Sequence, residues 1–537
     1  MMYSTVVSAS ISGIESRRVI VEADVSEGLP TFALVGFLAS ETREAAERVR
    51  TALRNSGVRL SPQHVTVNLA PAAFHKEGAH FDLAIAVALM GGYGFFPQRA
   101  LDSVMLLGEL SLDGSIGSVR GVLEIVSHAK EYGCGTVIVP DDNLAEGSVI
   151  RDVTVLGAGN LNQVIHFLAE RSNERCYPMK ESSYEPPLIE PMPLRSMKAV
   201  ISKTMKEQDS GFGADFSQIR GQLLMRRAAE IAVSGFHNLL MIGPPGAGKS
   251  MTAKCIRSIL PKTSMEEALE ITKIHSVAGT LPDGTGLMTA RPFRAPHHTV
   301  TPAALCGGGK APEPGEISLA HRGILYLDEL PEFNRTTLEM LRGPLEDGCI
   351  RIARITGTYT FPSEFMLVAS MNPCRCGYFP DRSRCTCTNA QIRAYLSRIS
   401  MPLLDRIDMC VEARRVNYEE LTSVSCGESS AEIRKRVTAA RAVQDERYRG
   451  TKYRFNADLD SEAVRKYCAL DDECRKMMSM VYENMHLTAR SYTRILKTAR
   501  TIADLDNAPA IRPEHLTEAV SYRAVDRKYW ESAMRPA

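Results

Sequence analysis

An excess of charge of either sign is absent from this sequence. Its 537 residues contain 64 Lys and Arg against 63 Asp and Glu, a formal net charge of +1. Proteins that hold nucleic acid through their overall field are strongly basic, so that class is excluded. Any contact with nucleic acid must come from a local surface, such as the pore of a ring.

Long hydrophobic runs are also absent. The longest, Leu83–Phe96, contains three glycines and is too short to cross a bilayer. The N-terminal Met-Met-Tyr-Ser-Thr has no basic segment followed by an apolar one, so we expect no secretion signal. We therefore predict a cytoplasmic protein with no membrane partner. In that compartment the 13 cysteines are expected to be reduced, buried or metal-bound rather than paired in disulfides.

Internal repeats and low-complexity tracts are missing as well, and the length predicts about three or four domains. Residues 1–171 alternate β-rich and helical runs, which is typical of an α+β domain. Residues 172–197 are rich in proline and poor in apolar residues, which indicates an extended linker. Residues 198–416 form a central α/β segment, and residues 417–537 have apolar residues at helical spacing. The predicted fold class is multidomain α/β with a helical C-terminal part.

Individual elements are predicted from hydrophobic periodicity. In the first domain one amphipathic helix is expected at Glu41–Ser56, and strands are expected at Val19–Val25, Val65–Leu69, Val104–Leu107 and Thr136–Val139. In the last domain helices are expected at Glu432–Tyr448, Ser461–Met485, Arg490–Asp506 and Pro513–Val525, the last with proline at its first position.

A complete phosphate-binding loop follows the apolar run Leu239–Ile242 and precedes a predicted helix, Met251–Ile259. Its glycines let backbone N–H groups surround phosphates, and the helix N-terminus adds its positive dipole end. Lys249 is expected to reach the β- and γ-phosphates, and Ser250 is expected to bind Mg²⁺. The predicted nucleotide-binding residues are Gly243, Pro244, Pro245, Gly246, Ala247, Gly248, Lys249, Ser250 and Met251.

A second motif, Ile324–Glu329, is a β-rich run that ends in two carboxylates. A buried strand that delivers acids at its C-terminal end fits an α/β nucleotide site. Asp328 is placed to hold Mg²⁺ through water, and Glu329 is placed to polarise the attacking water. An ordinary strand before an exposed acidic turn would have the same pattern, but together with the phosphate loop the pair predicts ATP hydrolysis.

Further motifs surround these two. They are Asp-Phe-Ser-Gln-Ile-Arg-Gly-Gln at 215–222, Arg-Ala-Pro-His-His-Thr at 294–299, Pro-Gly-Glu-Ile-Ser-Leu-Ala-His at 314–321, Ala-Ser-Met-Asn-Pro-Cys at 369–374 and Pro-Leu-Leu-Asp-Arg-Ile-Asp at 402–408. With them the chain resembles, over essentially its whole length, the ComM/YifB family of Mg-chelatase-like AAA+ ATPases. The resemblance implies an AAA+ P-loop core, a C-terminal helical lid and a hexameric ring.

The same resemblance implies roles for three more residues. Asn372 would position the attacking water and sense the γ-phosphate. Arg406 matches an arginine finger, which acts on the ATP of the neighbouring subunit and stabilises charge on the transferred phosphoryl group. Arg490 matches a second sensor, with Arg494 as the alternative. A finger that acts in trans implies that one subunit alone is inactive.

Two segments are candidate DNA contacts. Arg351–Thr356 is predicted to be a strand of a hairpin that lines the central pore in related motors. Arg351 and Ile355 would share one face of this strand, and Ile352, Arg354 and Thr356 the other. Arg351 and Arg354 would then meet DNA phosphates, or else they are ordinary solvated arginines.

The second candidate segment is basic and contains Arg291, Arg294, His297 and His298. Adjacent histidines on a strand point to opposite faces, which disfavours a metal site. A structural or a DNA-facing role is therefore expected for this segment.

Four cysteines are grouped in two Cys-x-Cys pairs, Cys374 with Cys376 and Cys385 with Cys387. Four thiolates can close a tetrahedral structural Zn²⁺ site. The loop between the pairs is polar and rich in turn residues, so the chain can fold back on itself. The spacing is tighter than in most zinc sites, which leaves four reduced cysteines in a surface loop as the alternative.

The first domain resembles the protease domain of Lon and the related C-terminal domain of the RadA recombination ATPase, which implies a fold of the ribosomal S5 domain 2 type. The matching stretches are Lys76–Gly78, Phe81–Met90, Gly108–Gly114 and Val119–Leu123. Lon uses a Ser–Lys pair, but His80 stands at the serine position here and Leu123 at the lysine position. Leucine cannot act as a base, so we expect an inactive peptidase domain that serves assembly or DNA contact.

The leading hypothesis for function is an ATP-dependent, ring-forming DNA motor. The family resemblance implies a branch-migration helicase that acts on recombination intermediates in natural transformation. ATP, Mg²⁺ and structural Zn²⁺ are the expected cofactors, and DNA, single-stranded or branched, and further copies of the chain are the expected partners. The alternatives are a chelatase-type motor that remodels a protein partner, a Lon-like protease, which His80 and Leu123 oppose, and an ATP-gated scaffold, which the intact ATP site opposes.

Overall fold

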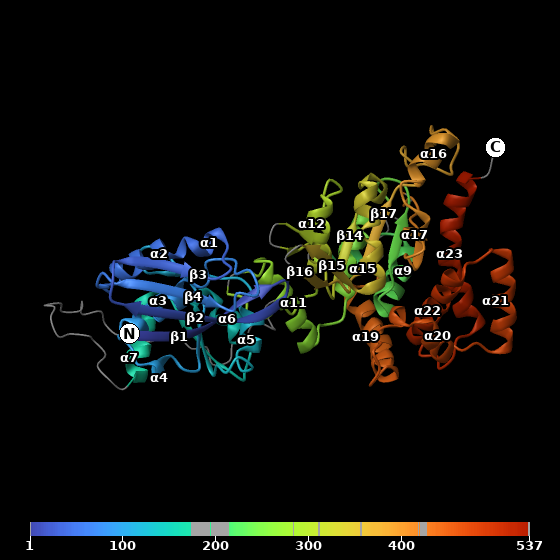
Figure 1. The fold of residues 1–537 in the computed structure, drawn as a ribbon. Coiled ribbons are helices and arrows are strands. Elements are labelled where there is room, and N and C mark those ends of the chain that lie inside the picture. Colours follow the sequence, from blue (N-terminus) through green and yellow to red (C-terminus); the bar gives the residue numbers. More distant parts are fainter. Residues whose placement is uncertain are drawn as a thin grey trace.

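The computed structural model describes residues 2–172, 194, 214–282, 284–309, 312–354, 357–416, 418 and 427–534. The predicted linker, residues 172–197, lies outside them except for Ser172 and Leu194. The described residues form a mixed α/β, multidomain chain with a parallel sheet and a helical C-terminal region, as the sequence predicts. In Figure 1 the N-terminal sheet (blue) and the C-terminal helices (orange and red) lie at opposite ends, with the parallel sheet between them. No helix in these ranges combines the length and the apolar character needed to span a membrane.

The N-terminal part is built on a seven-stranded mixed sheet in the order β3-β4-β2-β1-β5-β8-β9. The strands are β1 (Met2–Ser12), β2 (Glu15–Ser26), β3 (Thr31–Val35), β4 (His64–Ala70), β5 (Val104–Leu106), β8 (Thr136–Pro140) and β9 (Thr154–Ala158). All four strands predicted in this region are confirmed, three of them within longer strands. A small hairpin joins β6 (Glu109–Leu110) to β7 (Ile116–Gly117).

Helices cover this sheet. They are α1 (Ser40–Arg43), α2 (Ala45–Asn55), α3 (Asp82–Gly92), α4 (Gln98–Leu101), α5 (Val122–His128), α6 (Leu144–Gly147) and α7 (Leu161–Ser172). The single helix predicted at Glu41–Ser56 is wrong in one respect, because the chain turns at Glu44 and forms two helices. Thr42 explains the break, since its hydroxyl donates to the backbone oxygens of Lys76 and Gly78 and ties the first helix to that loop.

The central part is a five-stranded sheet in the order β11-β14-β17-β10-β18, and every pairing in it is parallel. The strands are β10 (Leu239–Ile242), β11 (Phe293–Arg294), β14 (Ile324–Leu327), β17 (Met366–Met371) and β18 (Met409–Glu412). The residues of β10, β14 and β17 are all buried, as expected for a parallel sheet covered on both faces. The carboxyl ends of all five strands therefore meet at one edge, where ligands of α/β sheets bind.

Helices and two hairpins surround the parallel sheet. The helices are α9 (Leu223–Gly235), α10 (Lys249–Ile259), α11 (Met265–Val277), α12 (Pro302–Cys306), α13 (Glu316–Leu319), α14 (Arg335–Glu339), α15 (Arg342–Asp347), α16 (Asn389–Leu396) and α17 (Met401–Leu404). The hairpins pair β12 (Gly307–Gly308) with β13 (Glu313–Pro314) and β15 (Cys349–Arg354) with β16 (Gly357–Pro362).

The C-terminal part is helical: α19 (Ser430–Arg447), α20 (Ser461–Tyr467), α21 (Asp472–Asn484), α22 (Ala489–Leu505) and α23 (Pro513–Met534). The helix predicted at Ser461–Met485 is two helices, because the Asp471 side chain accepts from the Cys474 amide and starts a new helix there. Helix α23 begins at Pro513, as predicted, but continues past Val525. This extension buries Tyr529 and Trp530 against α16 and β18. The burial of this apolar surface offsets the conformational entropy that the extra helical residues lose.

The N-terminal part docks on α11 of the central part. The Ser276 hydroxyl donates to the Glu146 carboxylate, and the Ser276 carbonyl accepts from the Gly121 amide at 3.3 Å. Lys273 pairs with Glu124 at 2.8 Å. These contacts lie around a small apolar cluster of Leu123, Val149, Ala268 and Leu287, which contains residues from both parts.

Candidate functional site

The phosphate-binding loop lies at the carboxyl edge of the parallel sheet, between β10 and α10. Gly246 and Gly248 have φ of +75° and +83°, a region that other residues rarely adopt. Gly243 is required for a different reason, since a Cβ there would lie 2.4 Å from the Ala413 carbonyl oxygen. The loop therefore presents bare backbone at the N-terminus of α10, which is an anion-binding arrangement.

Lys249, the first residue of α10, is buried in this loop. Its Nζ donates to the carbonyl oxygens of Gly243 at 2.8 Å and Pro244 at 2.9 Å, and to Asn372 Oδ1 at 3.1 Å. Burial lowers the pKa of Lys249, although the nearby carboxylates of Asp328 and Glu329 oppose the shift. Asn372 directly follows β17, so the fold brings these two predicted residues into contact from neighbouring strands.

Ser250 and Asp328 also meet, because β14 ends and α10 begins at the same edge of the sheet. The Ser250 hydroxyl donates to Asp328 Oδ2 at 2.8 Å, and Asp328 Oδ1 accepts from the Ser370 hydroxyl and the Glu329 amide. Burial would raise the pKa of Asp328, but the hydroxyls of Ser370 and Ser250 outweigh it and hold that pKa below its ordinary value. Hydroxyl and carboxylate oxygens are the ligands that Mg²⁺ prefers.

Ser370 is a site residue that the sequence analysis missed. It precedes Asn372 by two positions on the end of β17, so alternation along the strand places both on the same side. Tyr326 donates to the Ser370 hydroxyl at 3.2 Å and thereby orients it toward Asp328. The signal in the sequence was this i, i+2 spacing at the end of a buried strand.

Glu329 is exposed at the same edge. Its backbone has φ +52°, a left-handed conformation that is unusual for glutamate and turns the chain sharply after β14. Such backbone strain persists where the surroundings over-determine the conformation, as they often do at functional sites. The turn leaves the Glu329 carboxylate open to solvent beside the Ser250–Asp328 pair.

Arg406 lies at the opposite edge of the sheet. Asn238, which directly precedes β10, donates through Nδ2 to the Arg406 carbonyl at 3.0 Å and accepts from the Met409 amide at 3.0 Å. The phosphate-binding loop begins at the other end of β10, five residues after Asn238, which is roughly 17 Å of strand. The fold therefore does not bring Arg406 to the phosphate loop of its own chain.

The guanidinium of Arg406 is buried and is held by its own chain. Nε donates to the Arg342 carbonyl at 3.2 Å, Nη1 to the Pro402 carbonyl at 2.5 Å, and Nη2 pairs with Glu346 Oε1 at 2.6 Å. Arg490 is exposed and pairs with the same Glu346 oxygen at 3.1 Å. Arg490 is therefore a neighbour of Arg406 through Glu346. The alternative residue, Arg494, pairs instead with Asp408 at 3.6 Å.

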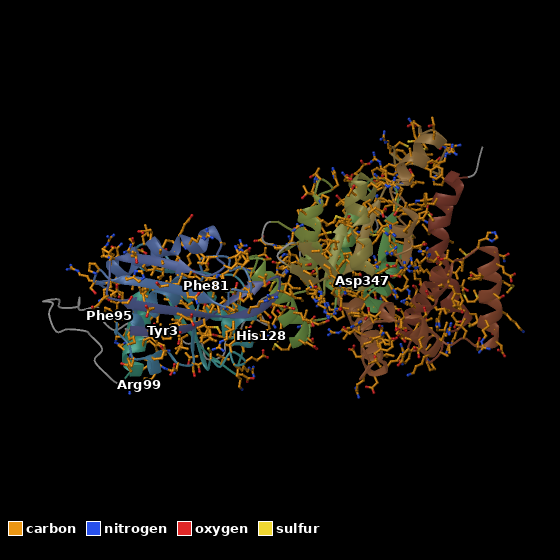
Figure 2. The ribbon with its side chains drawn as sticks, in the orientation of Figure 1. Tyr3, Phe81, Phe95, Arg99, His128 and Asp347 are labelled. Carbon is orange, nitrogen blue, oxygen red and sulfur yellow. The ribbon has the colours of Figure 1, made fainter. Side chains whose placement is uncertain are left out.

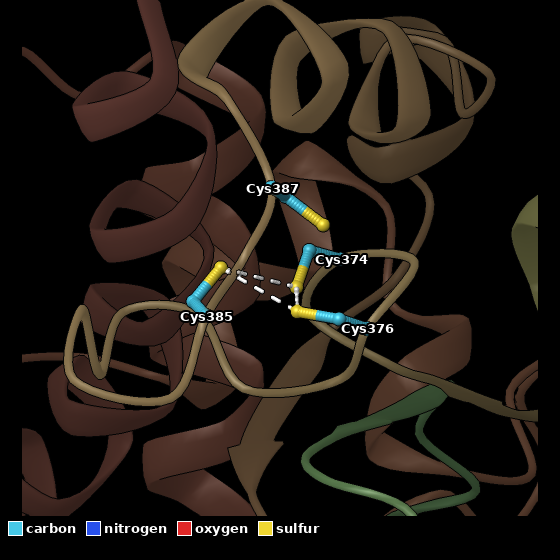
Figure 3. A group of neighbouring side chains, drawn as sticks. All are labelled: Cys374, Cys376, Cys385 and Cys387. Atoms are coloured by element: carbon cyan, nitrogen blue, oxygen red, sulfur yellow. Dashed lines mark hydrogen bonds between the residues drawn. The ribbon is translucent and has the colours of Figure 1, made fainter.

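The four cysteines of the predicted metal site converge (Figure 3). Their sulfur atoms all lie within 4.8 Å of one another. Sγ of Cys374 is 3.3 Å from that of Cys376 and 3.8 Å from that of Cys385, and the last two are 3.5 Å apart. Thiolates at about 2.3 Å from a tetrahedral Zn²⁺ are about 3.8 Å apart, so the residues fit that ion.

The cysteine loop touches the phosphate-binding loop. A Cβ on Gly377 would lie 2.4 Å from Pro245 Cδ, so the backbone of Gly377 packs directly against the ring of Pro245. Cys374 is two residues beyond Asn372 and is buried with Phe379 and Tyr395 in one apolar cluster. The cysteine loop thus supports two parts of the nucleotide site at once.

In the basic segment before β14, both arginines are held by partners within the chain. Arg291 is buried, pairs with Glu267 at 2.7 Å and donates to the Pro261 and Arg322 carbonyls, and Arg294 makes two bonds to Glu316. The strand geometry assumed for the two histidines is wrong, because β11 ends at Arg294. The rings of His297 and His298 lie in a loop and face each other with centroids 4.0 Å apart.

The predicted arginine-bearing strand is β15, within a hairpin. Arg351 stands opposite Thr360 on the exposed face, whereas Ile352 stands opposite Tyr359 on the face that packs toward the core. Arg354 is exposed at the end of β15. Ile355 and Thr356, which the prediction included, lie outside the described residues.

Of the two positions aligned with the Lon catalytic pair, His80 is partly buried and Leu123 is buried. His80 Nε2 donates to the Ala9 carbonyl at 3.1 Å, and burial lowers the pKa of His80 to about 4, so the ring is neutral at pH 7. Leu123 is fully buried in the cluster that joins the N-terminal part to α11. The serine hydroxyl and the lysine amine of the Lon pair are therefore both missing at these positions, and leucine cannot act as a base.

Comparison with known proteins agrees with this geometry. Residues 215–421 match the family described as magnesium chelatase, subunit ChlI; residues 21–143 match subunit ChlI of Mg-chelatase; and residues 427–523 match the ChlI C-terminal family. The chain is 39% identical over 529 residues to the uncharacterized protein YifB of Escherichia coli, and 36% identical over 532 residues to the competence protein ComM of Haemophilus influenzae. Both alignments cover 98% of each chain.

The chain belongs to the ComM/YifB family. Membership of this Mg-chelatase-like AAA+ family implies the use of ATP and Mg²⁺ and an ATPase activity. Similarity to Lon is partial: Lon protease 1 of Herpetosiphon aurantiacus is 30% identical over 186 residues, which cover 32% of this chain and 22% of that protease.

Proposed function

We propose that this ComM/YifB family member is a cytoplasmic, ATP-driven DNA motor that works as a hexameric ring. Its activity would be branch migration of recombination intermediates during natural transformation. The observation that carries the proposal is the separation of the catalytic parts onto two edges of one sheet. The Haemophilus influenzae relative is named as a competence protein, which supports the link to DNA uptake.

The carboxyl edge of the sheet would bind and hydrolyse ATP. Phosphate oxygens would replace the carbonyls that now accept from Lys249 Nζ, which leaves the ammonium between the β- and γ-phosphates. Ser250 and Asp328 would hold Mg²⁺, which neutralises charge on the phosphates. Glu329 would polarise the attacking water, and Asn372 would orient it and report on the γ-phosphate.

The placement of the arginines supports the proposal of a ring. Arg406 and Arg490 lie together at the edge remote from the phosphate loop of the same chain, and an arginine finger works only within contact of the phosphoryl group. A second copy of the chain would bring its ATP against this edge. The closed assembly would be a ring, because each subunit would contribute its arginines through one edge and bind its own ATP at the other.

DNA would pass along the β15–β16 hairpin. On the exposed face of that hairpin Arg351 lies opposite Thr360 and Ala353 lies opposite Thr358, while the other face packs against the core. Arg354 adds a second cation at the tip. Such contacts would bind phosphates without reading sequence, as a motor that travels along DNA requires.

The decisive experiment measures ATP hydrolysis by the purified chain with and without single-stranded and forked DNA. We expect forked DNA to raise kcat by about tenfold, a change of about 1.4 kcal/mol in the barrier, and Lys249→Ala to abolish hydrolysis with or without DNA. Hydrolysis that is robust but indifferent to DNA would refute the DNA motor. It would favour the alternative that the three chelatase matches suggest, a motor that remodels a protein partner.

The four cysteines would hold one structural Zn²⁺ ion. We expect Cys376→Ser to remove bound zinc and to lower the melting temperature by roughly 4–8 °C, which corresponds to about 2 kcal/mol. ATP hydrolysis should fall as well, because the loop rests on Pro245. Zinc content and thermal unfolding are the measurements. Cys349→Ser, a cysteine outside the cluster, is the control, and a Cys376→Ser protein with unchanged zinc would contradict the site.

A further inference from the structure

Arg406 is engaged at every guanidinium nitrogen within its own subunit. Two backbone carbonyls, of Arg342 and Pro402, accept from Nε and Nη1, and the Glu346 carboxylate takes Nη2. The side chain is only 6% exposed. In this position the guanidinium cannot reach a phosphate on another subunit, so action in trans requires it to leave these acceptors.

Glu346 is the one charged group among those acceptors, and it serves a second arginine. Its Oε1 lies 2.6 Å from Arg406 Nη2 and 3.1 Å from Arg490 Nη2. Hydrogen bonding from Arg406 lowers the pKa of Glu346, so the carboxylate is charged at neutral pH. Asp347, the next residue on α15, is labelled in Figure 2 and marks this segment in the central body of the molecule.

We propose that Glu346 stows Arg406 and Arg490 in the free subunit, which means that it holds both side chains in ion pairs away from any nucleotide. It would release them to the γ-phosphate of a neighbour's ATP. This inference rests on the proposed role of Arg406 in trans. A terminal phosphate carries more negative charge than one carboxylate, and a guanidinium group can bind a phosphate through two parallel hydrogen bonds, in a bidentate arrangement. The carboxylate therefore holds the pair only until a better anion arrives.

Stowage also links the neighbour's nucleotide to the β15–β16 hairpin. Arg406 grips α15 at both ends, through the Arg342 carbonyl and through Glu346. Helix α15 leads into β15 through Gly348, which has φ of +63°. When Arg406 leaves, α15 loses the hydrogen bond at the Arg342 carbonyl and the ion pair at Glu346 together. The hairpin that carries Arg351 is then held less firmly.

The test compares Glu346→Gln with the wild-type chain in two measurements. Glutamine keeps the shape of the side chain and removes its charge. Phenylglyoxal modification of Arg406, followed by mass spectrometry at a protein concentration below that of assembly, is expected to be about fivefold faster in Glu346→Gln. The protein concentration that gives half-maximal ATP hydrolysis is expected to fall about fivefold, because the arginines no longer have to be released.

Glu339→Gln is the matched control. Glu339 pairs with Arg342 at 2.9 Å on the neighbouring helix but with neither Arg406 nor Arg490, so both measurements should stay at wild-type values. Unchanged labelling in Glu346→Gln would overturn the stowage, whatever the hydrolysis shows. Unchanged concentration dependence would overturn its regulatory role.

Failure of the proposed function has a different signature. Full hydrolysis by Arg406→Ala would remove the finger itself, and with it the stowage as a control of activity. An inactive Arg406→Ala beside a Glu346→Gln chain that behaves as wild type would refute only the present inference.

Discussion

Replacement of Arg406 by alanine is expected to lower kcat for ATP hydrolysis at least about 10³-fold, with little change in KM. The reason is that the guanidinium would stabilise charge that develops only in the transition state, on a phosphate held by the next subunit. Steady-state hydrolysis is measured at a protein concentration that saturates assembly. Arg475→Ala, which removes a surface arginine paired with Asp472 on α21, is the control and should hydrolyse ATP normally.

Action in trans makes a further, sharper prediction for mixed rings. A Lys249→Ala subunit cannot hydrolyse its own ATP but still carries Arg406, whereas an Arg406→Ala subunit has an intact phosphate loop. A mixture of the two inactive variants should therefore recover part of the wild-type rate. An equimolar mixture that stays inactive, under conditions where the subunits exchange, would show that Arg406 serves its own site or none.

Replacement of Glu329 by glutamine is expected to lower kcat about 10²- to 10⁴-fold while ATP still binds. Glutamine cannot take up the proton of the attacking water, but it leaves Lys249, Ser250 and Asp328 in place for the phosphates and Mg²⁺. The measurements are steady-state hydrolysis and the affinity for a fluorescent ATP analogue. A loss of nucleotide affinity equal to the loss of rate would contradict a role confined to the water.

Glu332→Gln is the control for that variant. Glu332 lies three residues further along the same loop and pairs with Arg398 at 3.0 Å. It should retain hydrolysis within about threefold, because a partly exposed ion pair of this kind contributes at most about 1 kcal/mol. Equal losses in the two variants would indicate that the loop, rather than the Glu329 carboxylate, was disturbed.

Much of the nucleotide site could be predicted because its parts follow buried strands. The phosphate loop, Asp328 and Asn372 each come directly after a short apolar run, and in a parallel sheet such positions share an edge. The sequence does not show hydrogen bonds between those parts. Ser370, which bonds to Asp328, was missed for that reason.

Predictions that depended on local conformation alone were less successful. The histidines at 297 and 298 were assigned strand geometry, but the strand ends before them. The arginines at 291 and 294 left a DNA-facing role open until their partners, Glu267 and Glu316, were seen. The predicted helix lengths were wrong where a contact with a distant part of the chain decides where a helix ends. Thr42 makes such a contact at the first helix, and Trp530 makes one at the last.

By itself the sequence determined the chemistry of this protein: a phosphate loop, a pair of carboxylates after a strand, four paired cysteines and a family motif around Arg406. Each is a short pattern, and its meaning depends on neighbours within a few residues. Only the tertiary structure decided that Arg406 lies at the far edge of the sheet, stowed against Glu346, and that Leu123 is buried where the N-terminal part docks. Those facts depend on residues far apart in the chain, which pack together only once the whole fold has formed.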